Sequence, residues 1–192
     1  MPLTPCVVLD TETTGFPNNG GGFRGRIIEV GAVVVTADAR VVSQIAFFVR
    51  QPEAHLHSWQ AKRAMGVHGI RPRQVLREGL PSDQAAARFE RWIGRVVERF
   101  GVEEIRAYNQ AFDFWFLERD PWRLFRRTGL RRGEDIQLTA RRAMNRSTGP
   151  KLKAAVAFAN ANGAACPWEG GAHRAGEDAR MAAWMAVHLA GE

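Results

Sequence analysis

The chain has 192 residues, of which 45% are hydrophobic, and it carries a net charge of +7. This composition is typical of a globular protein, and we expect residues 1–192 to form a single domain. No apolar run approaches the roughly 20 residues that span a bilayer, and the N-terminus lacks the basic segment of a signal peptide. Two cysteines provide neither a disulfide framework nor a cysteine zinc site. We therefore expect a cytoplasmic protein with no membrane partner.

Three strands are expected first. Residues 5–10, PCVVLD, are typical of a short buried strand. Residues 27–36 and 41–49 predict two more strands, and the break at 38–40 predicts a hairpin between them. The segment 18–25, NNGGGFRG, is a glycine-rich connection that lacks the Lys-Ser or Lys-Thr of a P-loop.

Helices and a further strand follow. The apolar spacing at 84–100 predicts a helix that Ser82 or Asp83 caps. Residues 104–108 are a strand candidate, and Asn109 can cap a helix that runs to about residue 118. Three more helices are expected near 135–146, 151–162 and 174–190. This order predicts an α/β fold with a central mixed sheet covered by helices.

Positive charge is concentrated between Arg119 and Lys153. Eleven basic residues lie in this stretch, against only three acidic ones. The excess indicates a polyanionic partner, because neutralised phosphates release counterions. An ordinary solvated surface is the alternative.

Asp10 and Glu12 lie two residues apart at the end of the first predicted strand. Side chains alternate along a strand, so both carboxylates project from the same face. Two like charges held close together are unfavourable unless a cation neutralises them. A solvent-facing strand end is the alternative, but an apolar run precedes the pair and the turn-like Thr-Thr-Gly follows it.

Asp113 lies in a run of aromatic and apolar residues, FDFWFL at 112–117. Either this carboxylate is buried beside a partner that offsets desolvation, or it faces solvent while Phe112 and Phe116 face the core. The sequence leaves both readings open.

Asp178 begins an apolar stripe of the last predicted helix, a position that favours contact with a metal or other charges. His173 precedes it by five residues, which in a helix is a rotation of about 500°. We therefore expect His173 in the loop or first turn and Asp178 on the helix itself. A lone histidine of this kind is more often structural than catalytic.

Together these segments resemble the DEDDh branch of the DnaQ-like 3′–5′ exonucleases, which have a ribonuclease-H-like fold. The motifs are DTETTG at 10–15, NQAFD at 109–113 and HRAGED at 173–178. GVHGI at 66–70 is similar to a segment of the proofreading exonuclease subunits of DNA polymerase III. The resemblance implies a central mixed five-stranded sheet flanked by helices.

The resemblance also implies two Mg²⁺ or Mn²⁺ ions per active site. Asp10, Glu12 and Asp178 would hold the first ion. Asp10 would also contact the second, and Asp113 would bind it through water. Carboxylates are hard ligands that suit these ions, whereas zinc is disfavoured because no Cys/His cluster is present. His173 would be the general base for the attacking water.

Contacts to the terminal nucleotide are implied as well. They would come from Thr13, Ala64, His68, Asn109 and Phe112. Phe112 would pack against the nucleotide in a sequence-tolerant way. Two positions depart from the family pattern: Arg63 stands where proofreading relatives usually carry an acid, and Tyr108 replaces a frequent histidine. Neither change removes a metal ligand.

The implied activity is release of nucleoside 5′-monophosphates from single-stranded or frayed 3′ ends, with DNA favoured over RNA. An exoribonuclease that trims RNA 3′ ends is the alternative. A non-catalytic nucleic-acid-binding module is disfavoured because all five motif residues are present. Nucleophilic catalysis lacks support, since there is no Gly-x-Ser-x-Gly and Cys6 lies in a buried-strand pattern. The enzyme could act alone or bind a DNA polymerase subunit.

Overall fold

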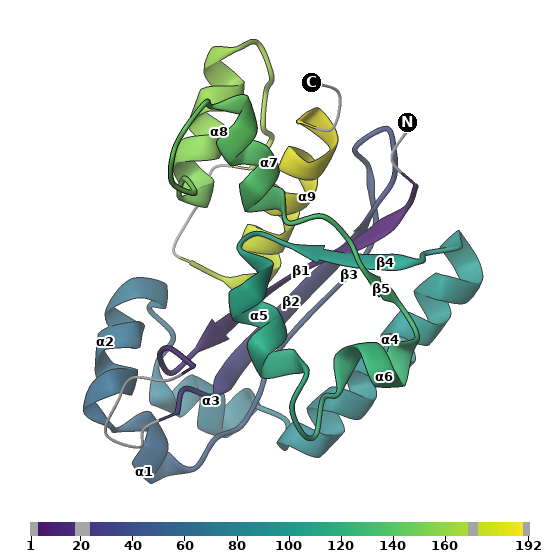
Figure 1. Ribbon diagram of the computed structural model, residues 1–192. Coiled ribbons are helices and arrows are strands. Elements are labelled where there is room, and N and C mark those ends of the chain that lie inside the picture. Colours follow the sequence, from purple (N-terminus) through teal and green to yellow (C-terminus); the bar gives the residue numbers. More distant parts are fainter. Residues whose placement is uncertain (1–3, 18–23, 169–172, 190–192) are drawn as a thin grey trace.

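The computed structural model describes residues 4–17, 24–168 and 173–189. Within these residues a five-stranded sheet carries helices on both faces (Figure 1). The strands lie in the order β3-β2-β1-β4-β5. Their bounds are β1 Cys6–Thr13, β2 Ile27–Val35, β3 Val41–Phe48, β4 Glu104–Ala107 and β5 Arg131–Arg132. The glycine-rich segment 18–25 lies outside the described residues, apart from Arg24 and Gly25.

The sheet is mixed, as expected. Strand β2 pairs antiparallel with both β1 and β3, and the expected β2–β3 hairpin is confirmed. Strand β4 pairs parallel with β1 on one side and with β5 on the other. Strand β5 was not located from sequence, because it has only two exposed arginines and no apolar pattern.

Strand β1 continues three residues beyond the predicted boundary at residue 10. Its pairing with β2 extends through Glu12, opposite Glu29, to Thr13, opposite Ile27. The prediction that Asp10 ends the strand was therefore wrong. Asp10 and Glu12 both lie on β1 itself, which fixes their backbones more firmly than a loop would.

The helices form the two layers that cover the faces of the sheet. Their bounds are α1 Glu53–Leu56, α2 Trp59–His68, α3 Pro72–Glu78, α4 Ser82–Phe100, α5 Gln110–Leu117, α6 Leu124–Thr128, α7 Ile136–Ala143, α8 Leu152–Ala161 and α9 Ala175–His188. The five predicted helices correspond to α4, α5, α7, α8 and α9, and the shorter α1, α2, α3 and α6 were not individually predicted. None of the described helices is long and apolar enough to cross a membrane.

Two of the predicted helix caps were wrong. Helix α4 begins at Ser82 itself, with Pro81 in the N-cap position and no side-chain cap. Asn109 does occupy the N-cap position of α5, but its backbone is left-handed and its side chain makes no capping bond. The Asp135 carboxylate accepts hydrogen bonds from the N–H groups of Asn109 and Gln110, at 3.0 and 3.1 Å. A distant carboxylate therefore replaces the expected local cap.

Alternation along β1 divides its side chains between two hydrophobic cores. Val7 and Leu9 belong to the core beneath α4, α5 and α6, and Cys6 and Val8 belong to the core beneath α7, α8 and α9. Continuing this alternation, Asp10 and Glu12 face the layer that contains α9, and Thr11 faces the opposite layer.

Helix α9 lies directly against β2 at Gly31. A Cβ atom at this position would overlap the backbone of Ala175 and Gly176. We predict that Gly31→Ala destabilises the protein by about 1–3 kcal/mol, because the helix must move away from the strand. Urea denaturation checks this value.

Gly94→Ala is the matched control. Gly94 lies in α4, and an added Cβ would have no neighbour within 4 Å. This variant should gain up to about 1 kcal/mol of stability from helix propensity. Equal destabilisation by both substitutions would contradict the packing argument.

Candidate active site

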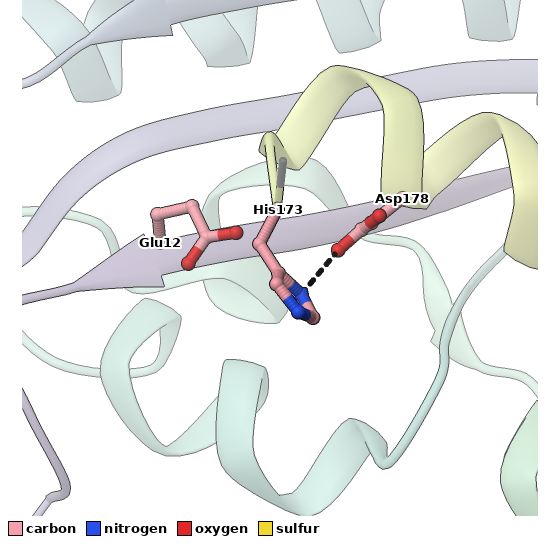
Figure 2. A group of neighbouring side chains, drawn as sticks. All are labelled: Glu12, His173 and Asp178. Carbon is pink, nitrogen blue, oxygen red and sulfur yellow. Dashed lines mark ion pairs between the residues drawn. The ribbon is translucent and has the colours of Figure 1, made fainter. Parts of the chain in front are cut away.

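Glu12, His173 and Asp178 converge beside β1 (Figure 2). Each offers one metal-ligand atom, and these three atoms lie within 4.8 Å of one another. Glu12 comes from β1, Asp178 from the first turn of α9, and His173 from the residues just before that helix. The structure therefore brings together side chains that are more than 160 residues apart in the sequence.

His173 lies in the loop before α9, as the helical geometry predicted. Its Nδ1 atom lies 3.3 Å from Oδ2 of Asp178. The two side chains differ in exposure, at 44% for His173 and 12% for Asp178. The histidine is therefore the solvent-facing member of the pair, and the aspartate lies against the protein.

Asp113 is buried, with only 2% of its surface exposed. Its Oδ1 atom accepts hydrogen bonds from the backbone N–H of Thr11 at 2.9 Å and from the Thr11 hydroxyl at 2.7 Å. Strand β4 makes its last pair with β1 at Leu9, so the N–H of Thr11 lies beyond the end of that ladder. The reading in which Asp113 faces solvent is excluded, and its bonds to Thr11 join α5 to β1.

The carboxylates raise one another's pKa values. The pKa of Asp10 lies well above its ordinary range because of burial and then because of Asp113, Glu12 and Asp178. Burial, followed by the charges of Asp178 and Glu29, raises the pKa of Glu12 to about 8. Burial also raises the pKa of Asp113 to about 7, although the Thr11 hydrogen bonds oppose the shift. Bound cations would relieve this repulsion, so the donor set fits divalent metal ions.

Glu29 and Arg174 were missed in the sequence. Glu29 is 2% exposed and lies opposite Glu12 on β2. Its carboxylate accepts hydrogen bonds from Nε of Arg174, at 3.0 and 3.1 Å, from Nη2 at 2.6 Å, and from the Ala175 N–H at 3.0 Å. It therefore fixes the start of α9. The available signal was one charge within the apolar run IIEVGAVVV.

The expected nucleotide contacts are only partly brought together. Thr13 is buried on β1, and its hydroxyl donates to the Gly15 carbonyl at 2.8 Å. His68 is 3% exposed, and burial lowers its pKa to about 4, although a hydrogen bond with the Thr13 backbone opposes the shift. The charge of His173 contributes to that lowering, which places the two rings near each other.

Ala64 and Phe112 approach this region through Phe16. Ala64 lines a cavity of about 280 Å³ together with Phe16, Trp59 and Arg63. The ring of Phe16 makes an edge contact with that of Phe112 at 6.1 Å. Asn109 differs, because its backbone N–H is bonded to Asp135, and no described contact links its side chain to this group. Its predicted substrate contact stays a prediction.

The sequence model of the family RNase_T, described as Exonuclease, matches residues 7–185. The chain belongs to this exonuclease family. It is a 3′–5′ exonuclease of the DEDDh type, and its mixed five-stranded sheet is the ribonuclease-H-like fold that the motifs predicted.

Solved structures show the same fold for this exonuclease. Exonuclease X in complex with 5′ overhanging duplex DNA is 21% identical, with a TM-score of 0.60 over 96% of this chain and 90% of that one. E. coli Exonuclease I in complex with a dT13 oligonucleotide is 18% identical, with a TM-score of 0.68 over 96% of this chain. The present chain spans 40% of the length of Exonuclease I.

A third similar structure is that of a 3′-exonuclease that recognises the histone mRNA stem-loop. It is 16% identical, with a TM-score of 0.68 over 97% of this chain and 64% of that one. At these identities the likeness shows the fold alone. No curated protein sequence matches the present chain.

We predict that Glu29→Gln lowers the free energy of unfolding by about 1.5–3 kcal/mol, because charge-assisted hydrogen bonds to α9 are lost. Urea denaturation measures the loss. Glu103→Gln is the control, since the Glu103–Arg131 pair is 69% and 70% exposed and should contribute less than about 1 kcal/mol. Equal losses in the two variants would refute the anchoring role of Glu29.

The raised pKa values predict how stability depends on pH. The pKa of Glu12 rises from 4.5 to about 8 on folding and that of Asp113 from 3.8 to about 7. The folded protein then holds protons that the unfolded chain releases, so metal-free stability should fall as pH rises from about 4 to about 8. Added Mg²⁺ or Mn²⁺ should raise Tm more at pH 8 than at pH 5.

Thermal denaturation with EDTA or with saturating metal measures both effects. Glu12→Gln should flatten the metal-free pH dependence, because it removes one of the repelling charges. A metal-induced rise in Tm that is the same at pH 5 and pH 8 would show that ions and protons do not compete at these carboxylates.

Proposed function

We propose that this exonuclease uses two divalent metal ions to release nucleoside 5′-monophosphates from single-stranded or frayed 3′ ends. The observation that carries the proposal is the convergence of buried, mutually repelling carboxylates from β1, α5 and α9 beside an exposed histidine. The family match over residues 7–185 supports one exonuclease domain that occupies the whole chain.

We assign the first ion to Asp10, Glu12 and Asp178, and the second to Asp10 and Asp113. Mg²⁺ or Mn²⁺ suits this predominantly carboxylate set. When bound, the ions would lower the pKa of the attacking water and stabilise the leaving 3′ oxygen. Glu12, Asp178 and His173 together offer carboxylate oxygens and one imidazole nitrogen as metal ligands. Zn²⁺ therefore belongs among the metals to be tested.

His173 is the proposed general base. Its Nδ1 atom faces Asp178, which orients the ring and leaves Nε2 to take the proton from the attacking water. The exposed position of the ring suits this role, because a substrate phosphate must reach the same place. Attack of this water on phosphorus breaks the bond to the 3′ oxygen of the preceding nucleotide, so the released nucleotide keeps its phosphate on the 5′ oxygen.

Thr13, His68, Phe112 and Ala64 are the proposed contacts to the terminal nucleotide. The contact of buried His68 with the Thr13 backbone supports this assignment, because it places the ring beside the end of β1. Asn109, at the start of α5, is a further proposed contact.

We favour DNA over RNA as the substrate. The segment 66–70 resembles proofreading subunits, and the similar structures of Exonuclease X and Exonuclease I contain DNA. The histone mRNA exonuclease makes RNA the second candidate. The same segment supports association with a DNA polymerase. Two free cysteines, Cys6 and Cys166, suit a reducing cytoplasm.

The test uses 5′-labelled single-stranded DNA and RNA with Mg²⁺, Mn²⁺, Zn²⁺ or EDTA. We expect a ladder that shortens stepwise from the 3′ end only with metal, and faster on DNA. Asp113→Asn should lower the rate by about 100-fold or more, because a charge that the reaction needs is removed. Asp83→Asn, which changes an exposed carboxylate on α4, should not alter it. Intact substrate in every lane would refute the proposed function.

A further inference from the structure

A second cavity, of about 310 Å³, is lined by residues from the C-terminal end of α5, the start of β2 and the start of α4. Its lining combines cationic and aromatic side chains. They include Arg24, Arg26, Trp115, Phe116 and Arg119. None of the motifs that define the candidate active site contributes to this lining.

The arginines of this cavity are not neutralised. Among the described residues, no acidic side chain forms an ion pair with Arg24, Arg26 or Arg119. Asp120 also lines the cavity, and its carboxylate accepts a hydrogen bond from Arg123 at 2.8 Å. The lining therefore carries three arginines that have no acidic partner among the described residues, beside one carboxylate that is paired with Arg123.

Other arginines of the basic stretch behave differently. Five of them form ion pairs with nearby acids: Arg123, Arg127, Arg131, Arg132 and Arg142. Three of the acidic partners, Glu90, Glu103 and Glu118, lie outside the basic stretch and offset part of its charge excess. Arg119 stands apart, since its guanidinium lies over the ring of Trp115, 3.3 Å from the ring centroid.

A series of aromatic contacts joins this cavity to the candidate active site. The ring of Phe16 contacts Phe112, with centroids 6.1 Å apart, and Phe112 contacts Phe116 at 5.3 Å. Phe116 contacts Trp115 at 5.0 Å. Phe112 and Phe116 lie one helical turn apart, about 5.4 Å along α5. These contacts therefore connect the cavity to the position proposed for the strand terminus.

We propose that this cavity binds the substrate strand on the 5′ side of its terminal nucleotide. The inference rests on the proposed function and adds a second binding position to it. Arginines neutralise phosphates, and aromatic rings or guanidinium planes stack with bases of any sequence. An acidic protein segment would use the charges but not the aromatic series that leads to the catalytic carboxylates, so a nucleic-acid strand is the better match.

The experiment measures binding of 5′-fluorescein-labelled oligothymidylates by fluorescence anisotropy. EDTA prevents cleavage, and the probes are a trimer and a 12-mer. For Trp115→Ala and for Arg119→Gln, we expect the Kd of the 12-mer to rise about tenfold. The Kd of the trimer, which reaches the cavity only with its first residue, should rise much less.

Salt dependence provides an independent measurement. Each phosphate contact on a single strand contributes about 0.7 to the slope of log Kd against log salt concentration. The double variant Arg24→Gln/Arg26→Gln should therefore lower the slope for the 12-mer by about 1.4. As a control, Arg95→Gln removes one positive charge from an exposed position on α4. It should leave both the affinity for the 12-mer and the salt slope unchanged.

The outcomes separate this inference from the proposed function. If the wild type digests the 12-mer with metal but the cavity variants bind it with unchanged Kd and slope, the cavity belongs to another ligand, such as an acidic protein. Equal weakening of trimer and 12-mer would also overturn the inference, since it indicates general distortion. A wild type that neither binds nor digests the 12-mer would refute the function itself.

Discussion

The contact of α9 with β2 at Gly31 sets the geometry of the whole candidate site. At that position the absence of a side chain lets the helix backbone rest on the strand. Glu29, two residues earlier on the same face of β2, holds Arg174 and the N–H of Ala175. Because α9 begins at a fixed point, Asp178 in its first turn lies above β1. His173 directly precedes Arg174, so the same contact also places His173. Steric fit and a partly buried ion pair thus place two motif residues that lie far from Asp10 and Glu12 in the sequence.

The site collects negative charge that the fold alone does not neutralise. Asp10, Glu12, Asp113 and Asp178 all have raised pKa values, and burial is the first cause for each. The local compensation is partial, since Thr11 hydrogen bonds support Asp113 and His173 supports Asp178. A protein tolerates such repulsion where cations or protons complete the structure. The arrangement is therefore prepared for ligand binding rather than optimised for stability.

The sequence predicted the features that depend on local periodicity. Four strands and five helices followed from apolar spacing, and alternation correctly put Asp10 and Glu12 on one face. Asp113 could not be resolved, because a carboxylate in an aromatic run is compatible with either face of a helix. Its burial depends on Thr11, which lies 102 residues away in the chain.

Other features depend on register and so were not visible in the sequence. Glu29 gains its role by lying opposite Glu12, which is a property of the β1–β2 pairing. Asp135 replaces the Asn109 cap because β4 brings the start of α5 close to α7. Strand β5 depends entirely on its neighbour β4 and has no apolar pattern of its own.

The hydrogen bonds between Thr11 and Asp113 have a further consequence for how ions would be held. Both bonds end on Oδ1, so Oδ2 is the oxygen that they leave available. On the proposed assignment, an ion between Asp10 and Asp113 would meet two carboxylates, one of them with its Oδ1 already bonded to Thr11, whereas an ion at Asp10, Glu12 and Asp178 would meet three. Water would therefore complete more of the coordination of the second ion than of the first.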